Sequence, residues 1–351
     1  MTREQTMAQP ETGAVGQSTG LAGRRFQVRD HYEVGREKVR EFARAVQNHH
    51  GAHQREPDAR KLGYEGLIAP PTFASVIGMA STRALLDSVL TDYDLTQVLQ
   101  TDQVFEMRRP ILAGDRMQTE VLIDSLRQFG DNDFIHVKFV LRNQHGEIAQ
   151  VGSSTIVARR GADVDPNLVE AVESIFMHVR PSELDETGPL AELPVAGVPL
   201  DIPAREPALV HTLPAFEELS PGTALPAGSA RLTRGDLANY AGVSGDPNPI
   251  HFSDRAAELV GLPTVVAHGM LTMGLAADYL TSWLGDPTAI EKFSVRFSGF
   301  VPVAADAATT VDFSGKIKSL DAGSRTGTIM LSGAADGRKL FGRALAEVRF
   351  A

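Results

Sequence analysis

Asp246 and His251 are the residues of this chain best placed to move protons. They lie five positions apart in the run Tyr240-Ala-Gly-Val-Ser-Gly-Asp-Pro-Asn-Pro-Ile-His251. Each of the two prolines fixes its own φ and keeps the preceding residue out of the α region, so Asp246 and Asn248 are held extended. A carboxylate and an imidazole on such a loop can share one water, one taking its proton and the other supplying one. The run is also rich in turn formers, and a plain turn is the alternative interpretation.

A second feature follows at Ala267-His268-Gly269-Met270, where a strongly apolar helix is predicted to begin. The first turn of a helix exposes backbone N–H groups and a partial positive charge. Because Gly269 has no side chain, its N–H can approach a thioester carbonyl oxygen as negative charge builds on that oxygen. Gly269 alone could simply ease packing, but the two features in succession favour catalysis. We also expect Tyr240, Asn248 and His268 to contact or support the substrate.

The elements around these residues occur twice along the chain. Each half contains a helix, a loop region with Gly, Pro and His, a buried apolar helix, and then strands only. This order indicates an α+β fold with antiparallel sheets. A single buried helix wrapped by such a sheet is a hotdog, so we predict a double hotdog, two antiparallel sheets each wrapping a central helix. The expected elements are helices at 37–47 and 233–241, apolar helices starting near 73 and 270, and strands at 117–123, 135–139, 293–297 and 340–350.

The predicted domain organisation has four parts. Residues 1–25 form a disordered tail, 26–160 the N-terminal hotdog, 161–212 a proline-rich linker and 213–351 the C-terminal hotdog. Leu168 to His178 could form a short helix, and the prolines that follow keep the linker extended and semi-rigid.

Composition limits the classes of function. The net charge of −10 argues against nucleic acid as a partner, and the absence of cysteine excludes thiolate chemistry. No apolar run is long enough for a membrane span or resembles a signal peptide, so we expect a cytoplasmic protein. No Gly-x-Gly-x-x-Gly follows a strand, so no redox cofactor is expected. His49, His50 and His53 have no further ligand nearby, and no metal site is predicted.

The region from Tyr240 to Trp283 resembles the hydratase motif of the MaoC-like (R)-specific enoyl-thioester hydratases and dehydratases. Residues 217–351 are more specifically similar to the HadB-type catalytic subunit of the (3R)-hydroxyacyl-ACP dehydratase of mycolic-acid elongation. The matching runs are Asn239 to Asp246, Asn248-Pro-Ile-His251, Ala267 to Gly274, Thr281 to Pro287, Val295-Arg-Phe297 and Phe341 to Ala344. The N-terminal half resembles the HadA/HadC-type partner subunit through Val34 to Val46, Leu62-Gly-Tyr64, Ala69-Pro70, Thr72-Phe73 and Pro110 to Asp115.

This resemblance implies a fused pair of subunits in which Asp246 and His251 are the catalytic residues and Gly269 helps to polarise the thioester carbonyl. The equivalent N-terminal loop, Val46-Gln-Asn-His-His-Gly-Ala-His53, lacks the acid and has Asn48 near its place. We therefore expect the N-terminal half to be catalytically silent and to supply dimer surface and one wall of the acyl tunnel. The two hotdogs would form a pseudo-dimer within the chain, which could assemble further into a homo-oligomer.

The expected substrates are acyl-ACP or acyl-CoA thioesters, with acyl carrier protein as a partner. One alternative is an enoyl-CoA hydratase of degradation or polyester supply, and another is a non-catalytic acyl-thioester-binding protein. A thioesterase would need an acid on the buried helix. Residues 270–277 offer none, and Asp278 lies deeper.

Overall fold

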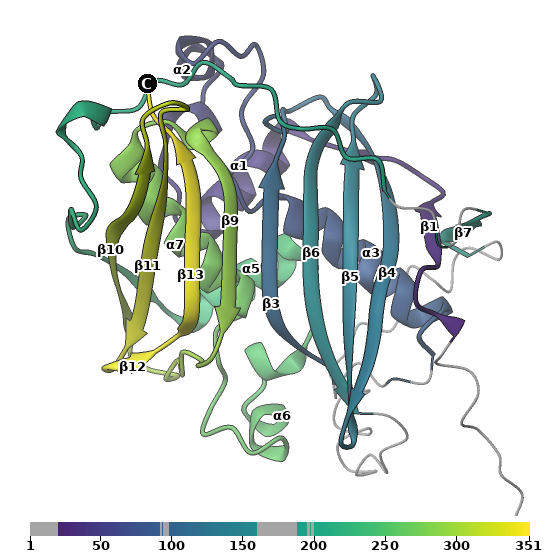
Figure 1. Ribbon diagram of the computed structural model, residues 1–351. Helices are drawn as coiled ribbons and strands as arrows, with labels where there is room; N and C mark the ends of the chain where they lie inside the picture. The colour runs from purple at the N-terminus through teal and green to yellow at the C-terminus, as the bar shows by residue number, and fades with distance from the viewer. Residues whose placement is uncertain (1–19, 92, 94–97, 160–187, 195–196, 198–199) are drawn as a thin grey trace, which may run out of the picture.

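Two antiparallel sheets, each curved around one long helix, form this computed structural model (Figure 1). The structure describes residues 20–91, 93, 98–159, 188–194, 197 and 200–351. The predicted double hotdog is confirmed.

The N-terminal half is built around helix α3 (Ala74–Ser88), which is the first predicted apolar helix. Two shorter helices precede it, and four long strands follow it. The elements are β1 (Arg25–Val28), β2 (Tyr32–Glu33), α1 (Arg36–Ala45), η2 (Gly51–His53), α2 (Glu56–Lys61), α3, β3 (Val98–Met107), β4 (Arg116–Phe129), β5 (Asn132–Arg142) and β6 (Ile148–Arg159).

The C-terminal half repeats this plan around helix α7 (Gly269–Leu284). Eleven of the sixteen residues of α7 are buried, as the apolar pattern on all sides predicts. The elements from the linker onward are β7 (Leu190–Leu193), η5 (Phe216–Glu218), β8 (Gly228–Leu232), α5 (Arg234–Ser244), η6 (Pro249–His251), α6 (Asp254–Leu259), α7, η7 (Pro287–Ala289), β9 (Ile290–Phe297), β10 (Thr309–Asp321), β11 (Thr326–Ala335), β12 (Arg338–Lys339) and β13 (Phe341–Arg349).

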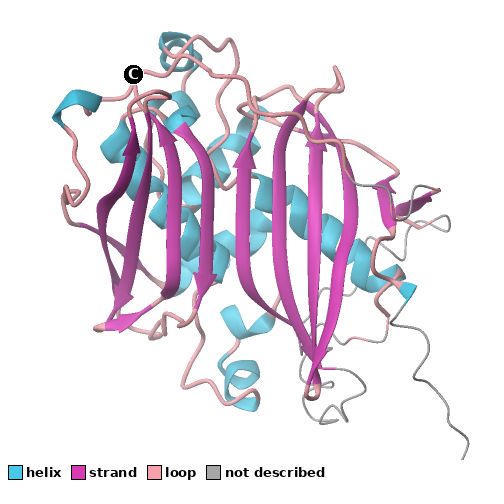
Figure 2. Ribbon diagram, viewed as in Figure 1, coloured by secondary structure: helices cyan, strands magenta, loops and turns pink. Residues whose placement is uncertain are grey.

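The two sheets join edge to edge into one continuous sheet. Its strand order is β7-β1-β4-β5-β6-β3-β9-β13-β11-β10-β8, and β3 pairs with β9 at the centre. Phe105 lies opposite Phe293 in this pairing, and Gln103 lies opposite Val295. Figure 2 shows the strands of both halves side by side, with the long helices behind them. The sequence predicted the two sheets but not this join.

The two halves match position by position through their loops. Helix α2 covers 56–61 and α6 covers 254–259, while η2 covers 51–53 and η6 covers 249–251, so equivalent residues differ by 198 in number. Under this offset Asn48 is equivalent to Asp246, and His53 is equivalent to His251. Asp254 and Glu258 lie on the exposed side of α6, as expected for a solvated face.

The described part of the linker lies against both halves. Strand β7 extends the N-terminal sheet by pairing with β1, and Leu200 and Ile202 pack on β5 and β6 residues of that sheet. Figure 1 shows the chain then crossing one end of the molecule towards the C-terminal half. The predicted helix at 168–178 lies outside the described residues. None of the described helices is both long and apolar enough to cross a membrane.

Candidate active site

The loop that carries Asp246 begins where helix α5 ends. A capping box between Thr233 and Asp236 starts α5, and Gly245, in the left-handed conformation at φ 75°, ends it. The Asp246 carboxylate then accepts a hydrogen bond from the Asn248 N–H at 3.1 Å. The Asn248 side chain in turn accepts one from the Ile250 N–H at 3.3 Å, which caps η6. These bonds fix the carboxylate relative to His251.

His251 is held in a defined tautomer. Its Nδ1 lies 2.7 Å from the Val266 carbonyl oxygen. A carbonyl oxygen can only accept, so Nδ1 donates its hydrogen and Nε2 keeps a free lone pair. The side chain is buried but still lines the large cavity described below. Burial lowers the pKa of His251, and the charge of Asp246 partly offsets this effect. The imidazole is therefore a neutral base at neutral pH.

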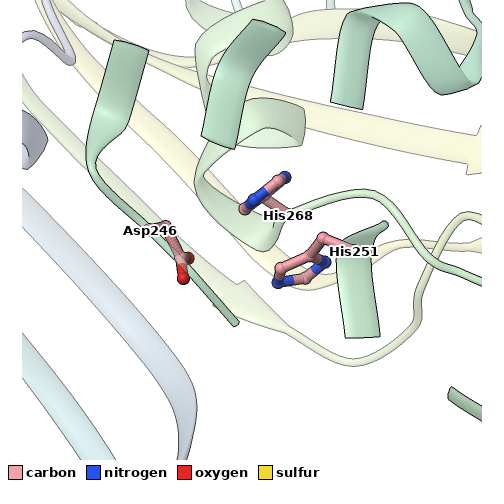
Figure 3. A group of neighbouring side chains, drawn as sticks. All are labelled: Asp246, His251 and His268. Carbon is pink, nitrogen blue, oxygen red and sulfur yellow. The ribbon is translucent and has the colours of Figure 1, made fainter. Parts of the chain in front are cut away.

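His268 lies directly against His251, as Figure 3 shows. The two rings stack with centroids 3.7 Å apart, and the ring of Tyr240 lies 4.9 Å from His268. Burial, followed by the charge of His251, lowers the pKa of His268 well below its ordinary value. Burial also raises the pKa of Tyr240. Neither His268 nor Tyr240 is among the residues that line the large cavity, so we assign them to the support of His251.

Gly269 is the first residue of α7, and no side chain caps that helix terminus. The backbone N–H groups of the first turn are therefore left for another acceptor. A Cβ built on Gly269 would lie 3.4 Å from the ring of Phe297, so this ring packs on the glycine from one side. Gly269 and Met270 both line the cavity, as do Asp246 and His251.

A cavity of about 300 Å³ opens beside these groups, and both halves of the chain form its walls. The C-terminal half supplies the Asp246–His251 loop and the start of α7. The N-terminal half supplies one face of α3 and the inner face of its sheet. These N-terminal lining residues are Ala74, Ser75, Gly78, Met79, Thr82, Arg83, Leu86, Val98, Leu99, Gln100, Gln103, Phe105, Phe139, Leu141, Gly152, Ser154 and Ile156.

The glycines of α3 and α7 have different surroundings. A Cβ built on Gly78 of α3 would meet nothing within 4 Å. A Cβ on Gly274 of α7 would lie only 2.5 Å from the Val46 side chain. Helix α7 is thus closely packed at its glycine, whereas α3 leaves open space at its own.

The equivalent position in the N-terminal half has a similar backbone arrangement but different side chains at two of the site positions. His53 Nδ1 bonds the Ile68 carbonyl at 2.6 Å, as His251 bonds Val266. Asn48 replaces the acid and is 1% exposed, and complete burial lowers the pKa of His53 to about 3. Pro71 stands where Gly269 would be, and proline has no N–H to offer. The sequence pointed to the missing acid, whereas the missing N–H emerged only from the structural equivalence.

The space next to Ile68 to Pro71, the segment equivalent to Val266 to Gly269, is small. It measures about 30 Å³ and is lined by Ile68 to Pro71 together with Arg205 of the linker. The Arg205 guanidinium donates to the carbonyl oxygens of Met107 at 2.6 Å and Thr288 at 3.4 Å. Residues 46–53 line neither this space nor the large cavity, whereas the Asp246–His251 loop lines the large one.

Asp246, His251 and His268 present ligand atoms within 4.8 Å of one another. A zinc site needs lone pairs that converge on one point about 2.0 Å away. The histidine ring planes are inclined by 26° and their centroids lie 3.7 Å apart, so their in-plane lone pairs do not converge. We keep the prediction that the site works without a metal. His49, His50 and His53 do not form a cluster of potential ligands within the described part of the chain.

Asp278 is the acid that a thioesterase interpretation would need. Burial raises the pKa of its carboxyl group to about 7. The described residues that line the large cavity do not include it, so it offers no nucleophile or base there.

Comparison with known proteins gives matches in both halves. The profile described as "FAS1-like, dehydratase domain region" matches residues 20–150, and the profile described as "MaoC like domain" matches 218–332. A UPF0336 protein of Mycobacterium tuberculosis is 37% identical over 146 residues, which is 42% of this chain and 92% of the relative. A UPF0336 protein of Saccharopolyspora erythraea is 40% identical over 145 residues, with coverage of 41% and 92%.

Solved structures superimpose on nearly the full length of this chain. A MaoC-like dehydratase with 42% sequence identity superimposes with a TM-score of 0.83, covering 95% of this chain and 99% of that one. A Mycobacterium tuberculosis protein described as a double hotdog is 13% identical, with a TM-score of 0.61 and coverage of 93% and 96%. The second likeness concerns the fold alone.

Proposed function

This chain belongs to the MaoC-like dehydratases, and from that premise we propose that it interconverts (3R)-hydroxyacyl and trans-2-enoyl thioesters in fatty-acid elongation. One observation carries the proposal. A neutral imidazole with a free Nε2, a carboxylate and an uncapped helix N-terminus all line the same cavity. Together they supply a base, a charge partner for its protonated form, and a donor for a carbonyl oxygen.

In this mechanism the Gly269 N–H binds the thioester carbonyl oxygen and stabilises the negative charge that develops when C2 loses its proton. His251 Nε2 takes the C2 proton, and the imidazolium then delivers it to the C3 hydroxyl, which leaves as water. One base suffices because in a syn elimination both groups depart from the same face. The Asp246 carboxylate favours the imidazolium, consistent with its raising effect on the His251 pKa. Hydration of the enoyl thioester runs the same steps backwards.

The N-terminal half would hold the acyl chain. Apolar side chains from α3 and its sheet line that part of the cavity, including Met79, Leu86, Phe105 and Phe139. The carbonyl would lie at Gly269, with a phosphopantetheine arm reaching it from CoA or from acyl carrier protein. Comparing rates on matched ACP and CoA thioesters would separate an enzyme of elongation from a degradative enoyl-CoA hydratase.

The direct test is to add the protein to crotonyl-CoA and follow the absorbance of the conjugated enoyl group. We expect this absorbance to fall as water adds across the double bond, and the product to be the (3R)-hydroxy isomer. A protein that binds crotonyl-CoA but leaves the absorbance unchanged would instead be the non-catalytic acyl-thioester binder.

Gly78→Leu tests the position of the acyl chain. The leucine side chain would enter the open space beside α3, and the change favours the helix itself. We expect the ratio of kcat/KM for a long enoyl-CoA over that for crotonyl-CoA to fall tenfold or more, because a few methylenes in an apolar pocket are worth such factors. Because both kcat/KM values come from the same variant, their ratio does not depend on the fraction of the protein that is folded. An unchanged ratio would place the chain elsewhere.

A further inference from the structure

Three polar side chains lie in the mostly apolar cavity wall that the N-terminal half of the chain forms. Gln100 and Gln103 come from β3 and Ser154 comes from β6, where it lies directly opposite Gln103. We call these three residues the glutamine cluster. Its surroundings in the cavity wall are apolar, with Phe105, Phe139, Leu141, Ile156, Met79 and Leu86 among them.

The cluster is tied together by its own hydrogen bonds. Gln100 Nε2 donates to Gln103 Oε1 at 2.7 Å and to Ser154 Oγ at 2.9 Å. Gln103 Nε2 donates to the Val104 carbonyl at 3.0 Å, and Ser154 Oγ donates to the Asp102 carbonyl at 3.4 Å. These bonds use both Nε2 hydrogens of Gln100 but only one of Gln103. Gln103, which is 5% exposed, therefore keeps a donor for a group inside the cavity.

Arg83 adds a positive charge from the opposite wall. It lies on α3, and its Nε atom is buried and has no hydrogen-bond partner among the described residues. Arg83 forms an ion pair with Asp87, whose Oδ2 lies 3.7 Å from that Nε atom, beyond hydrogen-bond distance. The two walls together therefore offer hydrogen-bond donors to a group in the cavity.

Such a wall suits one class of acyl chain better than another. A methylene chain laid against Gln103 and Arg83 would shield the free Gln103 N–H and the Arg83 guanidinium from water without offering an acceptor, which costs free energy. An oxygen atom on the chain would accept their hydrogen bonds. We propose that the natural substrate carries a keto or hydroxyl oxygen on its acyl chain, bound by Gln103 and Arg83; this rests on the proposed function.

Helix geometry gives the approximate position of that oxygen. Ser75 lies at the catalytic end of the cavity, since its hydroxyl is close enough to Tyr240 to influence the pKa of that phenol. Arg83 lies eight residues further along α3, about 12 Å at 1.5 Å per residue. An extended chain covers this distance in roughly ten bonds. The oxygen thus belongs near the far end of a chain of about twelve carbons.

The test compares two enoyl-CoA substrates of about twelve carbons, one fully methylene and one with a keto group near its far end. We expect the wild-type protein to favour the keto substrate about tenfold in kcat/KM, the size of a buried hydrogen bond to a charged donor. Gln103→Leu and Arg83→Met should each bring this ratio close to one. Gln128→Leu, on an exposed hairpin, is the matched control and should keep the wild-type ratio.

Binding of the saturated acyl-CoA counterparts, measured by calorimetry, separates this inference from the proposed function. Crotonyl-CoA could fail to be hydrated while the keto chain still binds about tenfold more tightly than the methylene chain. In that case the glutamine cluster binds the chain oxygen, and the proposed reaction is wrong. If both chains react and bind equally well, or if the preference survives both substitutions, the inference is overturned.

Discussion

Asp246→Asn and His251→Ala are each expected to lower kcat for crotonyl-CoA hydration by a factor of 10² to 10⁴ or more, roughly the contribution of general acid–base catalysis. The alanine removes the imidazole that we propose carries the proton, and the asparagine removes the charge that stabilises the imidazolium. Steady-state kinetics give kcat, and circular dichroism with a thermal melt shows whether the variants stay folded.

The N-terminal half offers matched controls at the equivalent positions. Asn48→Ala and His53→Ala should leave kcat largely intact, because their loop faces no cavity of substrate size among the described residues. His53→Ala should lower the melting temperature, since it removes the buried bond to the Ile68 carbonyl. A collapse of kcat in either control, with the protein still folded, would contradict the assignment of catalysis to one half.

Gly269→Pro should lower kcat by about 10² to 10³, the usual effect of removing one oxyanion-hole donor. The substitution deletes the N–H that we place against the thioester carbonyl, and it reproduces the proline that the N-terminal half has at Pro71. The first position of a helix tolerates proline, and His268, at ψ 135°, already has a backbone suited to precede one.

Gly269→Ala is the control for that experiment, because it adds bulk and keeps the N–H. A Cβ there would lie in ordinary contact with Phe297, so the alanine variant should keep most of its activity. If proline and alanine lower kcat equally, the effect is steric and the backbone donor is not part of the mechanism. If neither lowers it, the carbonyl binds elsewhere.

The sequence predicted the fold well because each half contains clear local patterns of apolar and polar residues. The apolar pattern predicted α7, alternation predicted β9 and the middle parts of β4 and β5, and the strand-like sequence at 340–350 predicted β13. The Asp246–His251 loop could be found because its prolines and its spacing are local features. The catalytic roles of Asp246 and His251 remain predictions, which the kinetic experiments above test.

Features that depend on two distant segments were not visible in the sequence. The stacking of His268 on His251 joins two segments that are 17 residues apart. The glutamine cluster depends on the strand register that sets Gln103 opposite Ser154. The sequence shows a glycine at position 78, but only the structure shows that a side chain there would meet open space rather than a neighbour.

The β3–β9 pairing covers one edge strand of each half with the other half. If the halves were separated at the linker, β3 and β9 would each become an exposed edge strand of its sheet. Exposed edge strands promote aggregation. The C-terminal piece would keep its proton-transfer groups but lose the walls that hold the substrate. Covalent fusion keeps the two unlike pieces close together, which favours their pairing over pairing of like with like.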